Sequence, residues 1–431
     1  MNVYDSEKIR DILHKTFNAV GVESAKDADV VIINTCSIRD KAQEKVFHQI
    51  GRWKKIKKFK KNLIIGVGGC VASQEGADLF KRDSCIDIVF GPQTIHRIPT
   101  LINQKLITDK PQIDISFPEI EKFDYFPAPK VRKYKSFVSI MEGCDKYCSY
   151  CIVPYTRGSE FSRPLEDVVG ECAFLVKQGI KEITLLGQNV NHYLGSMGSL
   201  GGEADLAFLI SILSEIKGLE RIRFMTSHPV NFSDRLIDTY KNFPKLSNHL
   251  HLPVQHASNK ILLLMKRGHT IEEFKEKIYK IRKVRKNISI SSDFIVGFPS
   301  ETEKDFRELI DLVKELEFDQ SYSFIYSKRP GTLAAKMQDD LTQDVKKSRL
   351  LELQKVLKSN IIKISRRMLE TTQKVLIDHN KEDLKHSCSS FGYTENNRSV
   401  KISGKKISPG QLVKVKIINV SSFLLEGLLL S

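Results

Sequence analysis

Residues 137–151 read FVSIMEGCDKYCSYC, an apolar run that leads into a loop carrying Cys144, Cys148 and Cys151. The run predicts a β-strand, and the CxxxCxxC spacing gathers three thiols on the loop behind it. Thiolates hold iron–sulfur clusters, so three of them fit three corners of a cubane [4Fe–4S] cluster. No fourth cysteine lies nearby in the sequence, which leaves the fourth iron open for a chelating ligand. A structural zinc site is the alternative, but it normally uses four Cys or His ligands in paired spacings.

The strand before the cysteine loop is the first of six that alternate with helical patterns. We expect these strands at residues 137–141, 182–186, 221–225, 249–254, 288–296 and 321–326. Six consecutive right-handed βα units predict an α/β fold with a partial (β/α)6 barrel, whose chemistry lies at the carboxyl ends of the strands. The cysteine loop occupies one such end. This core is expected over residues 131–367 and finishes in a long basic helix over 342–367.

The chain before the barrel predicts a separate, smaller domain over residues 1–103. Apolar strand-like runs alternate there with helical patterns, which is typical of a flavodoxin-like parallel α/β sheet. The strands are expected at residues 30–34, 63–67 and 86–90, and the helices at 39–58 and 73–81. Residues 104–130 hold four of the 14 prolines and show little periodicity, so they are predicted to be a linker.

The last segment, residues 368–431, predicts a third domain of a different kind. Short strands separated by glycine turns indicate a small β-barrel, a shape often used on single-stranded or looped RNA. The strands are expected at residues 374–377, 399–403, 411–419 and 423–430. The candidate contacts to RNA phosphates are Arg398, Lys401, Lys405 and Lys406. The lysine run at 54–61 is either a solvated helix face or a second phosphate contact.

The charge balance points to a polyanionic partner. Lys and Arg number 68 against 52 Asp and Glu, a formal net charge of +16, and such an excess is typical of proteins that bind nucleic acid. The sequence has neither a run of about 18 apolar residues nor a basic start followed by an apolar run, which argues against membrane insertion and secretion. We therefore expect a cytoplasmic protein whose eight cysteines are reduced thiols.

The cysteine triplet resembles the signature of the radical S-adenosylmethionine (SAM) enzymes. Other segments resemble the methylthiotransferase branch of that family: NTCSIR at 34–39, GGC at 68–70, VPYTRG at 153–158, LGQNV at 186–190, HLPVQHAS at 251–258 and DFIVGFP at 293–299. Within that branch, HQIGRW at 48–53 and TENNR at 394–398 look most like the members that act on dimethylallyladenosine in tRNA. By the same resemblance, the last domain is a TRAM domain.

The resemblance implies that SAM chelates the open iron of the cluster at Cys144, Cys148 and Cys151, and that its cleavage there gives methionine and a 5′-deoxyadenosyl radical. It also implies a transferase that converts N(6)-(dimethylallyl)adenosine-37, beside the anticodon, to its 2-methylthio derivative. The implied partners are the tRNA anticodon stem-loop and an electron donor of the flavodoxin or ferredoxin type. Two other functions stay open: methylthiolation of a ribosomal protein or of threonylcarbamoyladenosine in tRNA, and RNA binding by a non-catalytic iron–sulfur protein.

Cys36 and Cys70 are candidate ligands of a second, auxiliary metal site. Each follows a predicted parallel strand, and such strands share one edge at their carboxyl ends, so the two thiols are expected to converge. Two small apolar residues in loops are the alternative. By resemblance the site is an auxiliary [4Fe–4S] cluster, for which the family uses a third cysteine in a Gly-Cys loop just upstream of a Met-Asn-x-Tyr-Asp-Ser stretch. Here residues 1–6 are MNVYDS, and both the first strand of the family's N-terminal domain and its cysteine are absent, so we expect a start codon placed too late, with in-frame codons upstream for a strand ending in Gly-Cys.

Six residues are candidates for the cofactor pocket because they lie at or just past the carboxyl ends of predicted barrel strands. They are Gly187, Gln188, Asn189, His228, Gln255 and Gly297. Ordinary turn chemistry is the alternative for each. Arg157 and Arg163 follow the cysteine loop and are suited to a bidentate pair with a carboxylate or phosphate, or to a surface salt bridge. Cys85, Cys172 and Cys388 are expected to be packing or bystander thiols.

Overall fold

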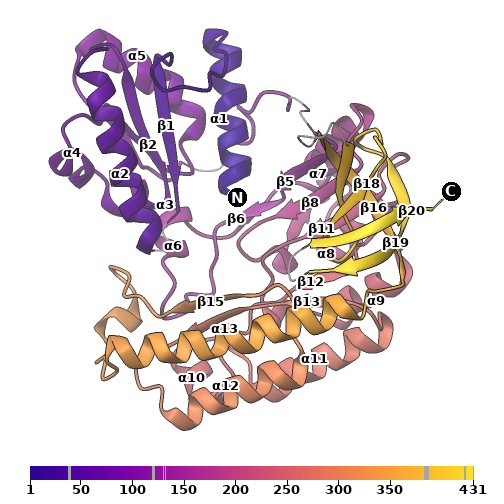
Figure 1. Cartoon of the computed structure of the whole chain (residues 1–431). Helices are drawn as coiled ribbons and strands as arrows, with labels where there is room; N and C mark the ends of the chain where they lie inside the picture. Colours follow the sequence, from indigo (N-terminus) through magenta and orange to yellow (C-terminus); the bar gives the residue numbers. More distant parts are fainter. Residues whose placement is uncertain are drawn as a thin grey trace.

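The computed structural model of the chain consists of three domains in the order predicted (Figure 1). It describes residues 1–36, 40–118, 122–129, 131, 133–382, 388–421 and 424–430. The end of the NTCSIR segment, the predicted helix start at residue 39 and the predicted strand start at residue 423 lie outside the described residues. No helix in the described part of the chain is long and apolar enough to cross a membrane.

The N-terminal domain is built on a parallel sheet in the order β1-β2-β3-β4. Its strands are β1 (Val30–Thr35), β2 (Ile64–Gly69), β3 (Ile88–Phe90) and β4 (Gln112–Asp114). The helices around it are α1 (Asn2–Phe17), α2 (Asp40–Lys57), α3 (Cys70–Glu75), α4 (Asp78–Arg82) and α5 (Ile98–Thr108), with the 3₁₀ turn η1 (Ile95–Arg97). Every residue of β2 is buried, because an inner parallel strand is covered on both faces.

Three parts of this domain differ from the sequence prediction. The helix predicted over 73–81 is divided into α3 and α4 at Gly76, whose φ of +53° is not helical. Strand β4 lies inside the segment predicted as a linker; Pro111 comes just before it, and β4 is an edge strand, where a sheet tolerates proline. The sequence does not predict helix α1, because half of its buried face is charged: Asp5, Lys8 and Asp11.

The central domain is the predicted open barrel of parallel strands, with the fifth strand divided in two at Ser292. Its strands are β5 (Lys135–Ser139), β8 (Glu182–Leu186), β11 (Arg221–Phe224), β12 (His249–His251), β13 (Ser289–Ser291), β14 (Asp293–Val296) and β15 (Tyr322–Ile325). Parallel pairing joins β5, β8 and β11, then β12 to β13 and β14 to β15. Single bridges, Ile222 to Leu246 and Gln255 to Phe294, connect these groups into one curved sheet.

Helices and short connecting elements surround these strands. The helices are α7 (Leu165–Lys177), α8 (Leu206–Ser214), α9 (Asp234–Asn242), α10 (Asn259–Leu264), α11 (Ile271–Val284), α12 (Glu303–Leu316) and α13 (Gln343–Arg366). The short elements are β6 (Met141–Glu142), α6 (Val153–Arg157), β7 (Phe161–Ser162), η2 (Val190–His192), β9 (Leu194–Ser196), η3 (Gly198–Leu200), β10 (Glu203–Asp205), η4 (Pro229–Asn231) and η5 (Leu333–Lys336).

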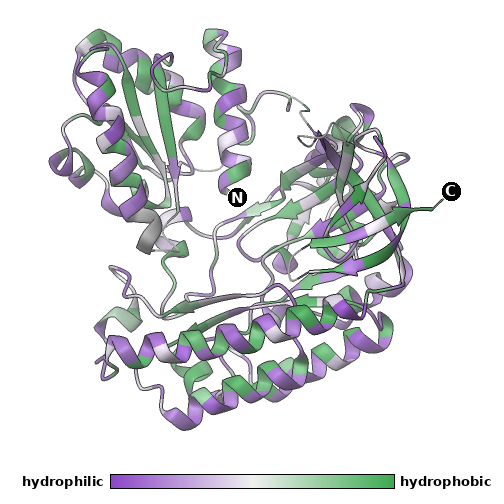
Figure 2. Cartoon of the chain, viewed as in Figure 1, coloured by the Kyte–Doolittle hydropathy of each residue, from purple (hydrophilic) through white to green (hydrophobic). Residues whose placement is uncertain are grey.

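Helix α12 shows how the sequence specifies the outer helices. Thr302 caps its first turn: Asp305 N donates to the Thr302 hydroxyl, and Thr302 N donates to the Asp305 carboxylate in return. Phe306, Leu309 and Val313 then recur at helical spacing and are fully buried in the core of the barrel. Figure 2 shows the resulting pattern, with hydrophobic strands inside and helices that carry both kinds of residue outside.

The C-terminal domain is a closed barrel with the strand order β16-β17-β18-β20-β19. Its strands are β16 (Thr372–Glu382), β17 (Cys388–Tyr393), β18 (Ser399–Ser403), β19 (Leu412–Val420) and β20 (Leu424–Leu429). The sequence does not predict β17, because CSSFGY is poor in β-branched residues; pairing with β16 and β18 on its two sides holds it in place. Cys388 therefore begins a strand and does not belong to a polar loop.

Candidate active site

The cysteine loop begins at the carboxyl end of the first barrel strand and is held there by backbone contacts. Cys144 N donates to Gly158 O at 3.2 Å. Gly143 has a φ of +78°, and a Cβ at this position would lie 1.8 Å from Ser159 O, so only glycine fits this close approach. The start of the loop therefore has one fixed position on the barrel.

The middle of the loop is tied to the region after the fourth barrel strand. Ser149 N donates to Met265 O at 3.0 Å, and the Ser149 hydroxyl donates to Leu264 O at 2.7 Å. Arg267, from the same region, places Nη1 at 3.5 Å from Cys148 Sγ. A cation is thus in place to stabilise the negative charge of a cysteine-ligated cluster.

The three thiols suit a cluster better than a single metal ion. Desolvation raises the pKa of Cys144 to about 11 and that of Cys151 to about 12, and the charge of the nearby Cys148 thiol acts in the same direction on both. A metal must therefore displace protons to bind them. A cubane would take one of these thiolates at each of three irons, whereas a structural zinc site normally uses four ligands in paired spacings.

Gln188 and Asn189 connect the second barrel strand to the cysteine loop. Gln188 Oε1 accepts a hydrogen bond from Gly143 N at 2.7 Å, so it supports the loop directly. Asn189 is 1% exposed and donates through Nδ2 to Asn231 Oδ1 at 3.3 Å. Its own Oδ1 is buried and has no hydrogen-bond partner within the described ranges.

His228 follows the third barrel strand and presents a buried nitrogen. Its backbone N donates to Asn191 Oδ1, and Asn191 Nδ2 donates to its backbone O, each at 2.8 Å. In the part of the chain that the structure describes, His228 Nε2, Ser227 Oγ and His269 Nε2 are buried without a hydrogen-bond partner. Desolvation, with the charge of Arg267 in addition, lowers the pKa of His228 to about 2 and that of His269 to about 4. Both imidazoles are therefore neutral near pH 7, and each carries one acceptor nitrogen.

The other predicted pocket residues face different surroundings. Gln255 has a left-handed φ of +74°, and its backbone bridges to β14 through hydrogen bonds on both sides. A Cβ on Gly187 would lie 2.4 Å from Met141 Cγ, and one on Gly297 would lie 2.5 Å from Lys346 Cγ. One side of Gly297 therefore packs against Lys346 of α13, and its place in the cofactor pocket stays a prediction.

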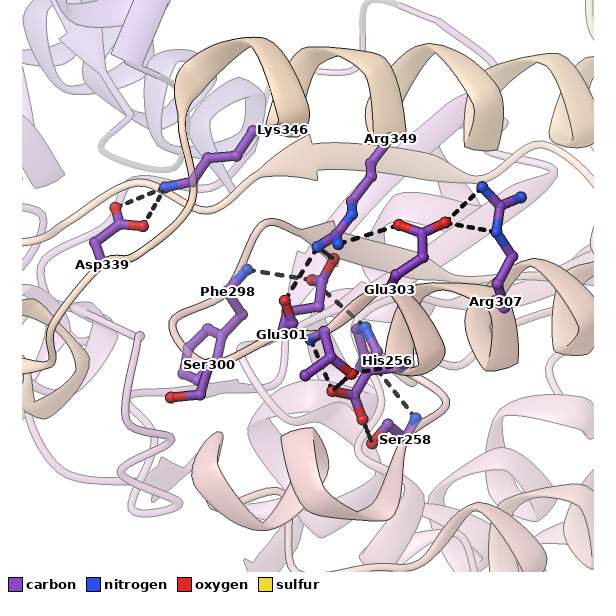
Figure 3. Close-up of polar contacts among 12 residues, drawn as sticks. His256, Ser258, Phe298, Ser300, Glu301, Glu303, Arg307, Asp339, Lys346 and Arg349 are labelled. Carbon is purple, nitrogen blue, oxygen red and sulfur yellow. Dashed lines mark hydrogen bonds and ion pairs between the residues drawn. The ribbon is translucent and has the colours of Figure 1, made fainter.

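A buried network fixes the loops after β12 and β14 to α13 (Figure 3). His256 Nε2 lies 3.5 Å from Glu301 Oε2, and both side chains are completely buried. Glu301 also accepts hydrogen bonds from Phe298 N at 3.2 Å and from Arg349 Nη1 at 2.8 Å. Arg349 continues to Glu303 Oε2 at 3.2 Å. The sequence does not reveal this network, because Glu301 and Arg349 are 48 positions apart and share no motif.

Cys36 and Cys70 lie at neighbouring positions on the carboxyl edge of the N-terminal sheet. Thr35, the last residue of β1, pairs in parallel register with Gly69, the last residue of β2, and one cysteine follows each. Adjacent strands are about 4.8 Å apart. The Thr35 hydroxyl donates to Gly68 O at 2.6 Å, and a Cβ on Gly69, at φ +91°, would lie 2.3 Å from Thr35 O. The two strand ends are therefore closely joined below the thiols.

Arg157 and Arg163 form buried ion pairs, not surface ones. Arg157 Nη2 lies 2.8 Å from Asp5 Oδ2, and Arg163 Nη1 lies 2.6 Å from Glu171 Oε2. Desolvation disfavours the Arg157 cation, but the charge of Asp5 and then that of the Cys70 thiol raise its pKa well above the usual range. Of the alternatives that the sequence leaves open, both arginines thus pair with carboxylates.

The C-terminal barrel packs on the amino ends of the central strands, and this corrects one prediction. Arg398, expected to contact RNA, is 1% exposed and pairs with Asp319, so its charge is unavailable to phosphates. Arg221, the first residue of β11, donates to Tyr393 O at 2.9 Å and to Lys374 O at 2.7 Å. The remaining predicted RNA contacts are exposed or half-buried: Lys401, Lys405 and Lys406.

Cys85 and Cys172 and the lysine run have structural surroundings. The two cysteines are buried in the hydrophobic cores of the N-terminal and central domains. In the run at 54–61, three of the lysines pair with aspartates of the same domain: Lys54 with Asp83, Lys57 with Asp87 and Lys60 with Asp29. These contacts agree with a solvated helix face.

Comparison with known proteins identifies each domain. Residues 138–313 match the radical SAM superfamily, residues 1–91 the uncharacterized protein family UPF0004 and residues 366–430 the TRAM domain. A radical SAM methyltransferase from Kitasatospora setae, solved with tryptophan and a SAM analog, has a TM-score of 0.56 and 16% identity over 78% of this chain and 72% of that one. A cobalamin-dependent SAM radical enzyme, solved with aqua-cobalamin and SAM, has a TM-score of 0.53 and 13% identity over 83% of this chain and 53% of that one.

Curated relatives match at much higher identity. Two of them, from Francisella tularensis subsp. novicida (strain U112) and subsp. tularensis (strain SCHU S4 / Schu 4), are named tRNA-2-methylthio-N(6)-dimethylallyladenosine synthase. Each is 61% identical over 417 residues, which is 97% of this chain and 94% of the relative. The chain therefore belongs to the family of tRNA-2-methylthio-N(6)-dimethylallyladenosine synthases, which are radical SAM enzymes.

Proposed function

We propose that this chain is a transferase that converts N(6)-(dimethylallyl)adenosine-37 of tRNA, beside the anticodon, to its 2-methylthio derivative. Family membership supports the reaction, and the TRAM domain with a net charge of +16 supports a tRNA partner. An anticodon loop presents its bases outside a regular helix, which suits entry of one base into a pocket. The enzyme is expected to act in the cytoplasm, where its substrate tRNA is found.

We infer that two [4Fe–4S] clusters and SAM are the cofactors. Cys144, Cys148 and Cys151 would hold the first cluster, and Cys36 and Cys70 would supply two of the three ligands of the second. When bound, the first cluster with SAM would supply radical chemistry at C2 of the adenine, the second cluster would supply the sulfur, and a further SAM would supply the methyl group. The electron donor would be a protein of the flavodoxin or ferredoxin type.

The other residues of the barrel mouth would hold and orient these groups. Gln188 fixes the cysteine loop through Gly143 N. Buried polar atoms without partners among the described residues, at Asn189, Ser227 and His228, offer hydrogen bonds to a bound ligand, because native interiors satisfy nearly all such atoms. The neutral His228 ring can donate a hydrogen bond from Nε2 without bringing a charge into the pocket, because its Nδ1 already accepts from Val230 N.

One observation gives this proposal most of its support: the parallel register that sets Cys36 beside Cys70 on the same sheet edge. Helix α3, which begins at Cys70, packs against α6, which follows the cysteine triplet. Cys70 opens one of these helices and Cys151 comes two residues before the other, where the N-terminal domain meets the barrel (Figure 1). Two groups of thiols so placed support a second cluster beside the first.

The test is to assay the anaerobically reconstituted protein on separate substrates. These are dimethylallyl-modified tRNA, unmodified tRNA, threonylcarbamoyl-modified tRNA and ribosomal protein. We expect 2-methylthio product only from the first, together with about eight irons per chain, as two cubanes require. Product formed only on ribosomal protein or on threonylcarbamoyl-modified tRNA would overturn the substrate, and a count of about four irons would overturn the second cluster.

A further inference from the structure

A chain of buried charges joins the N-terminal domain to the cysteine loop. Arg157 Nη2 lies 2.8 Å from Asp5 Oδ2 of α1, and Arg157 Nη1 lies 3.6 Å from Glu142 Oε1. Glu142 also pairs with Lys122, from the segment between the two domains. All four side chains are 4% exposed or less. We call Asp5, Lys122, Glu142 and Arg157 the Arg157 bridge.

The Arg157 bridge lies between the two groups of cysteines. Glu142 comes two residues before Cys144, at the start of the triplet loop. Arg157 ends α6, which packs against α3, the helix that begins at Cys70, and the Cys70 thiol is one of the groups whose charge acts on Arg157. The backbone O of Arg157 also accepts from Gln93 Nε2, after β3, at 2.7 Å. The Arg157 bridge is therefore linked to the Cys144 loop through Glu142, and to the sheet edge that carries Cys70 through α6 and α3.

The chemistry of the Arg157 bridge favours a single arrangement of the two domains. A buried charge that loses its partner is strongly unfavourable, so sliding one domain on the other would expose each of these groups to that penalty. The guanidinium is planar and presents its nitrogens in a rigid fork, which fixes direction as well as distance. An ammonium group can keep the charge but not the fork.

We propose that Arg157 is a positioning residue for the transfer of sulfur: it holds the Cys36 and Cys70 edge of the N-terminal domain at a set place over the Cys144 loop. The radical formed at one site then meets a substrate that already lies beside the sulfur of the other. This inference rests on the proposed function, since it requires that both sites carry clusters. Misplacement by about 1 Å can cost a reaction about a hundredfold in rate.

The chain contains a matched control for this role. Lys8, on the same helix as Asp5, pairs with Glu171 at 3.0 Å, and Glu171 pairs with Arg163 at 2.6 Å. This second set is buried to a similar degree and also joins α1 to the barrel. Arg163 Nη1 also donates to Ser139 O of β5 at 2.8 Å, so this second set ends in the first barrel strand instead of the cysteine loop. A change at Lys8 therefore loosens the same domain contact without touching the bridge.

The experiment compares Arg157→Gln, Arg157→Lys and Lys8→Gln with the wild type, all as full chains reconstituted with iron and sulfide. For each protein we would measure the iron content, the electron paramagnetic resonance spectrum, the thermal midpoint and the ratio of methylthiolated tRNA to 5′-deoxyadenosine. We expect wild-type iron and 5′-deoxyadenosine in both Arg157 variants, with a ratio about tenfold lower or worse. The auxiliary signal of the spectrum should shift in Arg157→Gln, and Lys8→Gln should lower only the thermal midpoint.

Several outcomes would overturn the proposal. An unchanged ratio in Arg157→Gln, or an equal fall in Lys8→Gln, would reduce the Arg157 bridge to a general domain contact. If Arg157→Gln does not fold, Asp5→Asn weakens the same bridge from α1, and its ratio decides in the same way. A wild type with only about four irons would overturn the proposed second cluster and the bridge with it, so the two failures are distinguishable.

Discussion

Buried arginines join the central barrel to a neighbouring domain at each of its ends, and at the amino ends they bind backbone carbonyls as well as carboxylates. At the carboxyl ends of the strands, Arg157 pairs with carboxylates from two domains, beside the cysteines. At the amino ends, Arg221 and Arg223 donate to backbone carbonyls of the C-terminal barrel, and Arg398 pairs with Asp319. The first junction lies beside the cysteine loop, and the second lies at the opposite ends of the strands.

The two junctions therefore differ in what they bring to the site. Carbonyl acceptors belong to the backbone and fix the C-terminal barrel by its main-chain geometry, and the carboxylates of this junction, Glu182 and Asp319, lie at the amino ends of the strands. Carboxylates beside the cysteines bring charge to the place where clusters and substrate would meet. The central barrel therefore separates the cysteine loop, at the carboxyl ends of its strands, from the C-terminal barrel suited to RNA, at their amino ends.

The largest effect that can sharpen this comparison is expected at the carboxyl end. Cys148→Ala removes one of three cluster thiolates, so the iron count should fall by about four and 5′-deoxyadenosine formation should be lost. Cys70→Ala should also lower the iron count but should leave 5′-deoxyadenosine formation in place while abolishing the methylthio product. Both variants would be followed by iron analysis and by chromatography of the nucleoside products. Equal behaviour of the two would contradict separate roles for the two sites.

The next effect tests the amino end. Asp319→Ala leaves the Arg398 guanidinium buried without its carboxylate, which is expected to destabilise the junction by about 3–5 kcal/mol. Differential scanning fluorimetry and limited proteolysis of the C-terminal barrel would measure it. As the control, Glu370→Ala removes an exposed pair with Lys416 in the same domain and should cost about 1 kcal/mol or less. If the two variants matched in stability, the Arg398 pair would not be a docking contact.

A smaller effect concerns acid stability at the barrel mouth. Desolvation, then the charges of Arg267 and His269, hold the pKa of His228 at about 2, below its ordinary value of 6.5. Below pH 6.5 the His228 ring binds a proton in the unfolded chain but stays neutral in the folded one. Its contribution to stability is therefore complete above that pH and is lost as the pH falls towards 2. This group alone lowers the free energy of unfolding by about 1.4 kcal/mol per pH unit in that window. Between pH 6.5 and pH 5, the free energy of unfolding of His228→Gln, measured in urea, should fall less steeply with decreasing pH than that of the wild type, by about 1.4 kcal/mol per pH unit. Equal slopes in the two proteins would refute the prediction.

The smallest effect separates binding from docking in the C-terminal barrel. Lys405→Ala and Lys406→Ala should each weaken tRNA binding without sequence preference and reduce the slope of log affinity against log salt by about one. Neither should change the thermal midpoint, since surface substitutions usually alter stability by less than about 0.5 kcal/mol. Salt-dependent binding assays would show it. An unchanged slope in both variants would move the RNA contact to another face.

Local patterns were enough to predict the cysteine loop and the strand ends that surround it. The cysteine triplet lies within eight residues, so its spacing is visible in the sequence. The six barrel strands follow from repeated apolar runs, and the carboxyl-end rule places Gln188, Asn189 and His228 at the mouth. The packing of Lys346 of α13 against Gly297 is visible only in the fold, because the two residues are far apart in the sequence.

The sequence by itself determined the order of domains, the parallel strands and the chemistry of the cysteine loop, because each depends on residues that are neighbours along the chain. The tertiary structure alone decided which charges are buried together. Arg398 is a docking residue because Asp319, 79 positions away, meets it in the interior. Arg157 likewise pairs with Asp5, which is 152 positions away in the sequence. Charged residues have no periodic pattern that shows their partners, and the cost of burying them unpaired is felt only when the domains pack.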